Sequence, residues 1–349
     1  MPPTSYHSKH WTSHFKQLMD QLQHIDSDHL KNSNHAPYEL IYQENKLRLF
    51  RYLPLDVPQK NTPILCVYAL INRPYILDIV PERSLVLRLL KQGYPVYLVD
   101  WGYPDTSDCM TSLNDYINGL LYRCVQQVKR HGDVQKIDLL GICQGGVFSL
   151  CYTALHPSCI RKLITLVTPV DFQVKESTVE QWGTSVFINQ EPSHHNIPGL
   201  ALTLLFKTLK PFQLNREKYR QLDQLVHDKK QLIFFLEMEK WINDSPDLAG
   251  KAADEFGRSF YQKNQLHLKK LHLGNVAVLL ENIRCPVLNI FATSDHIVAP
   301  QSSAALQQHI PPKLYQELKL EGGHIGAFIN KSTQHALVNR VDSWLSAIN

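Results

Sequence analysis

A cysteine flanked by glycines is the residue of this chain best suited to covalent chemistry. Cys143 stands in Gly141-Ile-Cys-Gln-Gly145, directly after the apolar run 136–140 and before a segment of helical character. The pattern is that of a nucleophile elbow with cysteine in place of serine. Its glycines permit a sharp strand-to-helix turn, which exposes the sulfur and points a helix N-terminus at it, and this favours the reactive thiolate. The alternative is a glycine-rich turn that holds a buried structural cysteine.

Two later loops supply the partners that a cysteine nucleophile needs. Asp295 follows the apolar run 286–291, and His324 follows the run 315–320. Nucleophile, acid and histidine in this order, each at the C-terminal end of a strand, are typical of the α/β-hydrolase fold. We expect His324 to take the thiol proton and Asp295 to orient the imidazole. His296 is a competing candidate, although its side chain is expected to point away from Asp295.

Backbone N–H groups are expected to stabilise the oxyanion of an acyl-transfer intermediate. The N–H of Gln144, directly after the nucleophile, is predicted to form half of this oxyanion hole. The other half is expected from the loop that follows the strand ending at Tyr68, from either Leu70 or Ile71.

Alternating strands and helices must position these residues. A hairpin with Glu44-Asn45 at its turn is expected first, followed by short buried strands that alternate with amphipathic helices. This alternation predicts a mostly parallel sheet covered on both faces. The expected strands are 38–42, 47–52, 63–68, 95–99, 136–140, 162–167, 286–291 and 315–320.

The strand pattern is interrupted once, which predicts the domain organisation. Residues 171–282 are largely helical in pattern and are expected to form a cap, or lid, inserted into the sheet domain. Residues 38–170 and 283–349 then form an α/β-hydrolase core, and 1–37 an amphipathic N-terminal helix with a polar linker.

Composition excludes several classes of protein. The 349 residues are 44% hydrophobic and carry a formal net charge of only +4, so nothing supports nucleic-acid binding. Residues 1–28 contain no apolar core like that of a signal peptide, and no apolar run reaches the ~20 residues of a membrane span. Seven cysteines without a close-spaced pair argue against a disulfide framework and a zinc site. We expect a cytoplasmic protein without a metal.

Several segments in combination resemble polyhydroxyalkanoate synthases, from about residue 38 to the C-terminus. They are Asn72-Arg-Pro-Tyr-Ile-Leu-Asp78, Asp100-Trp-Gly-Tyr-Pro104, Gly141-Ile-Cys-Gln-Gly145, Glu239-Lys-Trp-Ile242 with Asp244-Ser-Pro-Asp247, Asp295-His-Ile-Val298 and Gly322-Gly-His-Ile-Gly326. Only the combination is specific, because cysteine elbows also occur in dienelactone-hydrolase-like enzymes. Residues 181–196 depart from the family pattern, which leaves the cap geometry open there.

The resemblance implies an activity and a setting. Synthases of this family polymerise (R)-3-hydroxyacyl-CoA, commonly 3-hydroxybutyryl-CoA, into an insoluble polyester and release coenzyme A, which is part of the substrate and not a cofactor. The short chain resembles the class III and class IV catalytic subunits, so we expect a dimer or hetero-oligomer with a second synthase subunit (PhaE-like or PhaR-like) at the polyhydroxyalkanoate granule.

The resemblance also implies which residues are catalytic and which contact the substrate. The family's nucleophile, acid and histidine match Cys143, Asp295 and His324. In the family the aspartate has also been assigned to activating the 3-hydroxyl, so the role of Asp295 stays open between the two. Contacts with substrate are expected from Asn72, Tyr75, Trp101 and His296.

Two other functions compete with this interpretation. A cysteine-dependent α/β-hydrolase or thioesterase would use the same residues but transfer the acyl group to water. A granule-binding scaffold would need no nucleophile at all. Free 3-hydroxy acid as the product would identify the first, and unchanged behaviour without Cys143 would identify the second.

Overall fold

An eight-stranded sheet forms the centre of the part of the chain that the structure describes. The computed structural model describes residues 35–174, 195–208 and 228–347. The strand order is β1-β2-β4-β3-β5-β6-β9-β10; β1 and β2 form an antiparallel hairpin, β2 pairs antiparallel with β4, and the remaining neighbours are parallel. The strands are β1 Tyr38–Glu44, β2 Leu47–Tyr52, β3 Ile64–Val67, β4 Val96–Asp100, β5 Ile137–Ile142, β6 Ile160–Leu166, β9 Val287–Ala292 and β10 Tyr315–Leu320. The predicted mostly parallel α/β sheet is confirmed.

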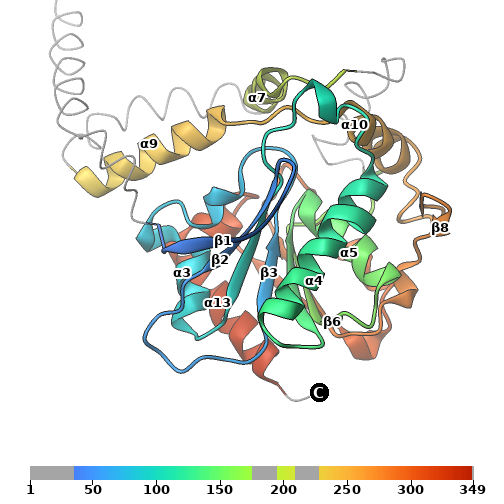
Figure 1. The fold of residues 1–349 in the computed structure, drawn as a ribbon. Coiled ribbons are helices and arrows are strands. Elements are labelled where there is room, and N and C mark those ends of the chain that lie inside the picture. The colour runs from blue at the N-terminus through green and yellow to red at the C-terminus, as the bar shows by residue number, and fades with distance from the viewer. Residues whose placement is uncertain (1–34, 175–194, 209–227, 348–349) are drawn as a thin grey trace, which may run out of the picture.

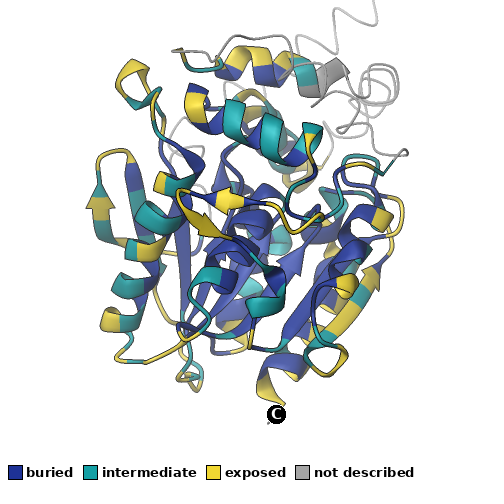
Figure 2. Cartoon of the chain, turned by 90° about the vertical axis from the view of Figure 1, so that its right-hand side faces the viewer, coloured by how far each residue is buried: buried dark blue, intermediate teal, exposed yellow. Residues whose placement is uncertain are grey.

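Helices cover both faces of the sheet (Figure 1). They are α3 Leu85–Lys91, a π-helical segment Asp115–Leu121 continuing into α4 Tyr122–His131, α5 Gln144–Leu155, α11 Pro300–Ala304, α12 Gly326–Ile329 and α13 Lys331–Ser346. One apolar cluster joins one face to α4 and α5, and a second joins the other face to α3 and α13. Every residue of β3, β4 and β5 is buried, as expected for parallel strands between two helical layers, and Figure 2 shows this burial at the centre of the molecule.

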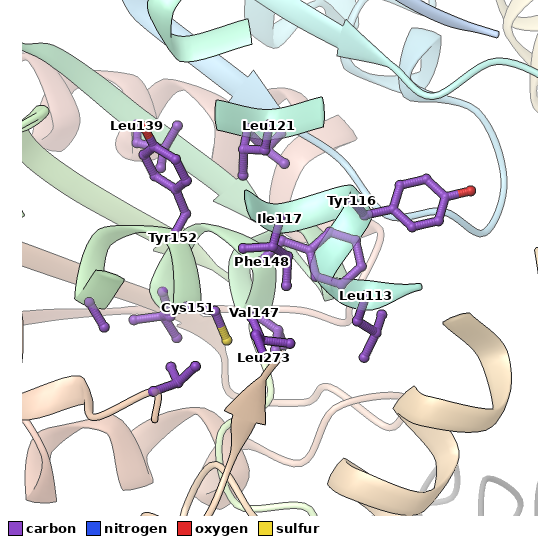
Figure 3. Close-up of a cluster of buried hydrophobic side chains, with 14 of the residues drawn as sticks. Leu113, Tyr116, Ile117, Leu121, Leu139, Val147, Phe148, Cys151, Tyr152 and Leu273 are labelled. Carbon is purple, nitrogen blue, oxygen red and sulfur yellow. The ribbon is translucent and has the colours of Figure 1, made fainter. Parts of the chain in front are cut away.

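The core between sheet and helices is continuous on the α4–α5 side. Figure 3 shows Tyr116, Ile117 and Leu121 of the π-helical segment beside Val147 and Phe148 of α5. The apolar residues at helical spacing in the π-helical segment and α4, among them Tyr116, Ile117, Leu121, Val125 and Val128, thus form a buried face.

In the chain, the segment that connects β6 to β9 forms helices and a small hairpin, and this is the segment predicted to be a cap. Its elements are α7 Gly199–Thr208, α9 Lys229–Asn243, α10 Gly250–Phe256, a π-helical segment Gly257–Gln262, and the strands β7 His272–Leu273 and β8 Val276–Ala277. In Figure 1, α7 and α9 lie above the sheet. The β7–β8 hairpin was not predicted, because two-residue strands leave no readable alternation in the sequence.

Some boundaries differ from the sequence predictions. The hairpin turn is Asn45-Lys46, one residue later than expected, and Asn45 takes a positive φ of 51°, which asparagine tolerates well. Between β9 and β10, the chain forms α11 followed by the 3₁₀ turn Ala305–Gln308. The expected N-terminal helix and most of 181–196 lie outside the described residues.

Candidate active site

Cys143 occupies a strained turn between β5 and α5. Its φ of 54° and ψ of −124° lie where non-glycine residues are rare, and its N–H donates to the Leu166 carbonyl at 2.9 Å. A Cβ on Gly145 would lie 2.2 Å from the carbonyl oxygen of Val67, and one on Gly141 would lie 2.5 Å from Cα of Gly146. Glycine is therefore required on both sides of the cysteine, as a nucleophile elbow demands.

Asp295 and His324 come together from the loops after β9 and β10. Nδ1 of His324 lies 2.7 Å from Oδ2 of Asp295, and the two side chains are 5% and 1% exposed. The other carboxylate oxygen accepts the N–H groups of Ile297 and Val298 at 2.8 and 2.9 Å. The Asp295 carboxylate is thus held in place, and His324, not His296, is its histidine partner.

The electrostatics of His324 favour a charged imidazole. Burial disfavours the imidazolium, but the negative charges of Asp295 and Cys143 and hydrogen bonds to both raise the pKa of His324 to about 10. The imidazole thus interacts with the acid on one side and with the cysteine on the other. This is the arrangement of an activated nucleophile, its base and the group that orients the base.

Cys143 differs from the thiols that pack inside the protein. Cys66, Cys151 and Cys285 are buried, and burial raises the pKa of each thiol to about 12. Cys143 is partly exposed. Because the thiolate is the reactive species, these three buried thiols are poor nucleophiles at neutral pH.

The candidate oxyanion donors lie at the start of α5 and in the loop after β3. Gln144 is the first residue of α5, so no carbonyl of its own helix can accept its N–H. The N–H of Leu70, however, donates to Oε1 of Gln144 at 3.0 Å. The N–H of Leu70 is therefore already used in a hydrogen bond within the protein. The N–H of Ile71 stays the predicted oxyanion donor from this loop.

Asn72 and Tyr75, both predicted to contact substrate, form hydrogen bonds with the segment after α9, and their role in substrate binding stays a prediction. Oδ1 of Asn72 accepts the hydroxyl of Ser245 at 2.9 Å, and the hydroxyl of Tyr75 donates to Asp244 at 3.1 Å. Asn72 also has a positive φ of 60°. These side chains therefore join the loop after β3 to the segment between β6 and β9.

The other two expected contacts lie in different settings. Trp101 is 5% exposed, its ring packs edge-on against Phe148, and its ring N–H donates to the carbonyl of Tyr68 at 2.9 Å. This burial favours packing over a contact with substrate. The ring of His296 lies beside Gly323, 3.9 Å from the position of an added Cβ. A role for His296 in substrate binding stays a prediction.

Neither a metal-binding cluster nor a membrane-spanning helix is found among the described residues. Within this part of the chain, no group of three or more His, Cys, Asp or Glu side chains is arranged to hold a metal ion. Over the same residues, no helix is both long and apolar enough to cross a bilayer.

Comparison with known proteins identifies the family. Residues 62–331 match the model of the alpha/beta hydrolase fold, and residues 9–89 match that of the poly-beta-hydroxybutyrate polymerase (PhaC) N-terminus. The poly(3-hydroxyalkanoate) polymerase subunit PhaC of Thiocystis violacea is 42% identical over 96% of this chain and 94% of its own. The chain belongs to the poly(3-hydroxyalkanoate) polymerase family. The corresponding subunit of Allochromatium vinosum is 45% identical, over 89% of this chain and 88% of its own. Because poly(3-hydroxyalkanoate) polymerases transfer acyl groups, membership of this family makes the chain an acyltransferase.

Solved structures support the fold alone. A monoacylglycerol lipase from Paleococcus ferrophilus matches with a TM-score of 0.53 at 16% identity, covering 86% of this chain and 98% of its own. An esterase from Thermogutta terrifontis matches with a TM-score of 0.53 at 14% identity, covering 89% and 98%. Both likenesses agree with an α/β-hydrolase core.

Proposed function

We propose that the polymerase extends its polyester through a thioester on Cys143, from short (R)-3-hydroxyacyl-CoA substrates such as 3-hydroxybutyryl-CoA. The Cys143 thiolate attacks the substrate carbonyl, and the oxyanion is stabilised by the N–H groups of Gln144 and Ile71. Collapse of this intermediate expels coenzyme A, which takes a proton from His324. The acyl group is then bound to Cys143.

The second half of the cycle forms the ester bond. The hydroxyl of another 3-hydroxyacyl group attacks the acyl-Cys143 carbonyl while His324 takes the hydroxyl proton. Cys143 leaves as a thiolate and the new ester is released. Exchange of one thioester for another is nearly neutral in free energy, so the acyl group stays activated until the hydroxyl attacks.

Asp295 acts by orienting His324 and stabilising its charged form, and not by activating the hydroxyl directly. The observation that supports this role is the commitment of both carboxylate oxygens, one to His324 and the other to two backbone N–H groups. With its side chain 1% exposed, the carboxylate offers very little surface to a substrate hydroxyl.

The proposed setting of the enzyme is the surface of a polyester granule. The chain works in the cytoplasm at the surface of the polyester granule, with a second synthase subunit, and residues 171–282 act as its cap. The similarity to relatives named as polymerase subunits supports a multi-subunit enzyme. Coenzyme A enters only as part of the substrate, and neither a metal nor another cofactor takes part.

One experiment separates the polymerase mechanism from hydrolysis. The purified chain is incubated with (R)-3-hydroxybutyryl-CoA, with and without the candidate second subunit, while thiol release and insoluble polyester are both followed. We expect both products, and neither in Cys143→Ala. Thiol release with only monomeric 3-hydroxybutyrate would show a thioesterase, and polymer formation by Cys143→Ala would exclude the covalent mechanism.

A further inference from the structure

A short segment after α9 contacts the loop that follows β3. The hydroxyl of Ser245 donates to Oδ1 of Asn72 at 2.9 Å. Asp244 accepts the hydroxyls of Tyr75 and Tyr103 at 3.1 and 2.8 Å. Segment 244–248 is therefore held against two loops of the sheet domain.

The same segment is bound to the start of α7. Leu248 and Ile197 exchange two backbone hydrogen bonds of 2.9 Å, and Asp247 accepts the N–H of Gly199 at 2.8 Å. A Cβ on Gly199 would lie 1.9 Å from the Ser245 carbonyl oxygen, so the two backbones are in close contact. Segment 244–248 thus joins α7 to the loop after β3.

Ile71 lies between two fixed neighbours in that loop. Before it, the N–H of Leu70 is held by Gln144 of the elbow. After it, Asn72 has a positive φ of 60° and is held by Ser245. The loop is thus attached on both sides of Ile71, before it to the nucleophile elbow and after it to segment 244–248.

We propose that Ser245 is a positioning residue for the oxyanion hole, acting through Asn72 on the direction of the Ile71 N–H. This inference rests on the proposed covalent mechanism, in which that N–H contacts the oxyanion. The hole is complete only while segment 244–248 is seated on the sheet domain. Displacement of the segment would lower the rate of acyl transfer without removing any catalytic residue.

The test compares Ser245→Ala with two matched variants of the full chain. Ser245→Thr keeps the hydroxyl, and Ser343→Ala removes an exposed hydroxyl whose bond, to the carbonyl of Asn339, lies within α13. Turnover of (R)-3-hydroxybutyryl-CoA should fall roughly 10- to 100-fold in Ser245→Ala, mainly in kcat, which is less than the outright loss of an oxyanion donor. Ser245→Thr and Ser343→Ala should behave like the wild type.

A spectroscopic signal distinguishes positioning from general destabilisation. Carbon-13-labelled butyryl-CoA lacks the 3-hydroxyl needed for elongation, so it traps acyl-Cys143, whose carbonyl stretch is read by difference infrared spectroscopy. The stretch should move to higher frequency in Ser245→Ala, because a hydrogen bond to the carbonyl is weakened. Asn72→Gly, which keeps the left-handed backbone but loses the side-chain bond, should give the same shift even if Ser245→Ala fails to fold.

An unchanged carbonyl stretch and kcat in Ser245→Ala or Asn72→Gly would overturn the inference while leaving the proposed function intact. Failure of the wild-type chain to form any acyl-Cys143 would instead refute the covalent mechanism, and the inference with it. The two failures are therefore distinguishable in one set of samples.

Discussion

The side chain of Gln144 accepts a hydrogen bond of 3.0 Å from the backbone N–H of Leu70. The side chain of Gln144 therefore fixes the opposite loop, while its backbone N–H is a proposed oxyanion donor. This link makes the elbow and the loop after β3 one structural unit.

Gln144→Ala should lower the free energy of unfolding by removing the link between the elbow and the loop after β3. The buried N–H of Leu70 would lose its acceptor, which costs about 1–3 kcal/mol of unfolding free energy. Urea unfolding followed by tryptophan fluorescence measures this loss, and Gln308→Ala, at an exposed glutamine, should stay within about 0.5 kcal/mol of the wild type. Wild-type stability in Gln144→Ala would contradict the importance of the bond.

Asp295→Asn should slow the acylation of Cys143 as well as elongation. An amide in this position no longer stabilises the imidazolium or selects the correct tautomer of His324, so kcat should fall by roughly 10³- to 10⁴-fold. Rapid mixing with substrate separates the first thiol released from later turnovers. A normal first release with slow elongation would show instead that Asp295 acts on the 3-hydroxyl.

The sharp turn at Cys143 and the pairing of Asp295 with His324 could be predicted because each of the three residues is marked locally in the sequence. The glycines around Cys143 are required by close backbone contacts, and the loops after two strands carry Asp295 and His324. The choice between Leu70 and Ile71 could not be made, since it depends on where the Gln144 side chain lies. The Ser245–Asn72 bond was also missed, because it joins residues 173 positions apart.

Stability should fall at alkaline pH through His324. Its pKa is raised from 6.5 to about 10, so the folded state retains this proton more strongly than the unfolded state. The contribution is complete below about pH 6.5 and is lost as the pH rises through about 10. Unfolding free energies measured across this range should decrease more steeply for the wild type than for His324→Gln. Parallel curves for the two proteins would refute the raised pKa.

Gly145→Ala should disrupt the elbow. The added Cβ would lie 2.2 Å from the Val67 carbonyl oxygen and 2.6 Å from that of Tyr68, so α5 must move away from the loop after β3. Overpacking of this kind costs about 1–3 kcal/mol or more, and activity should be lost with it. Gly326→Ala is the control, because no described atom lies within 4 Å of its added Cβ. Equal melting temperatures for the two variants would contradict the argument.

Arg73→Ala should destabilise the protein more than the loss of an exposed arginine. Arg73 pairs with Asp100 at 2.7 Å, with side chains only 5% and 6% exposed, so its removal leaves a buried carboxylate with Arg48 as its remaining cation among the described residues. Breaking such a pair costs about 3 kcal/mol. Arg51→Ala, which breaks the exposed pair with Glu39, should cost at most about 1 kcal/mol. Equal losses in urea unfolding would show that Asp100 is adequately solvated without Arg73, and that the loop after β3 does not depend on this pair.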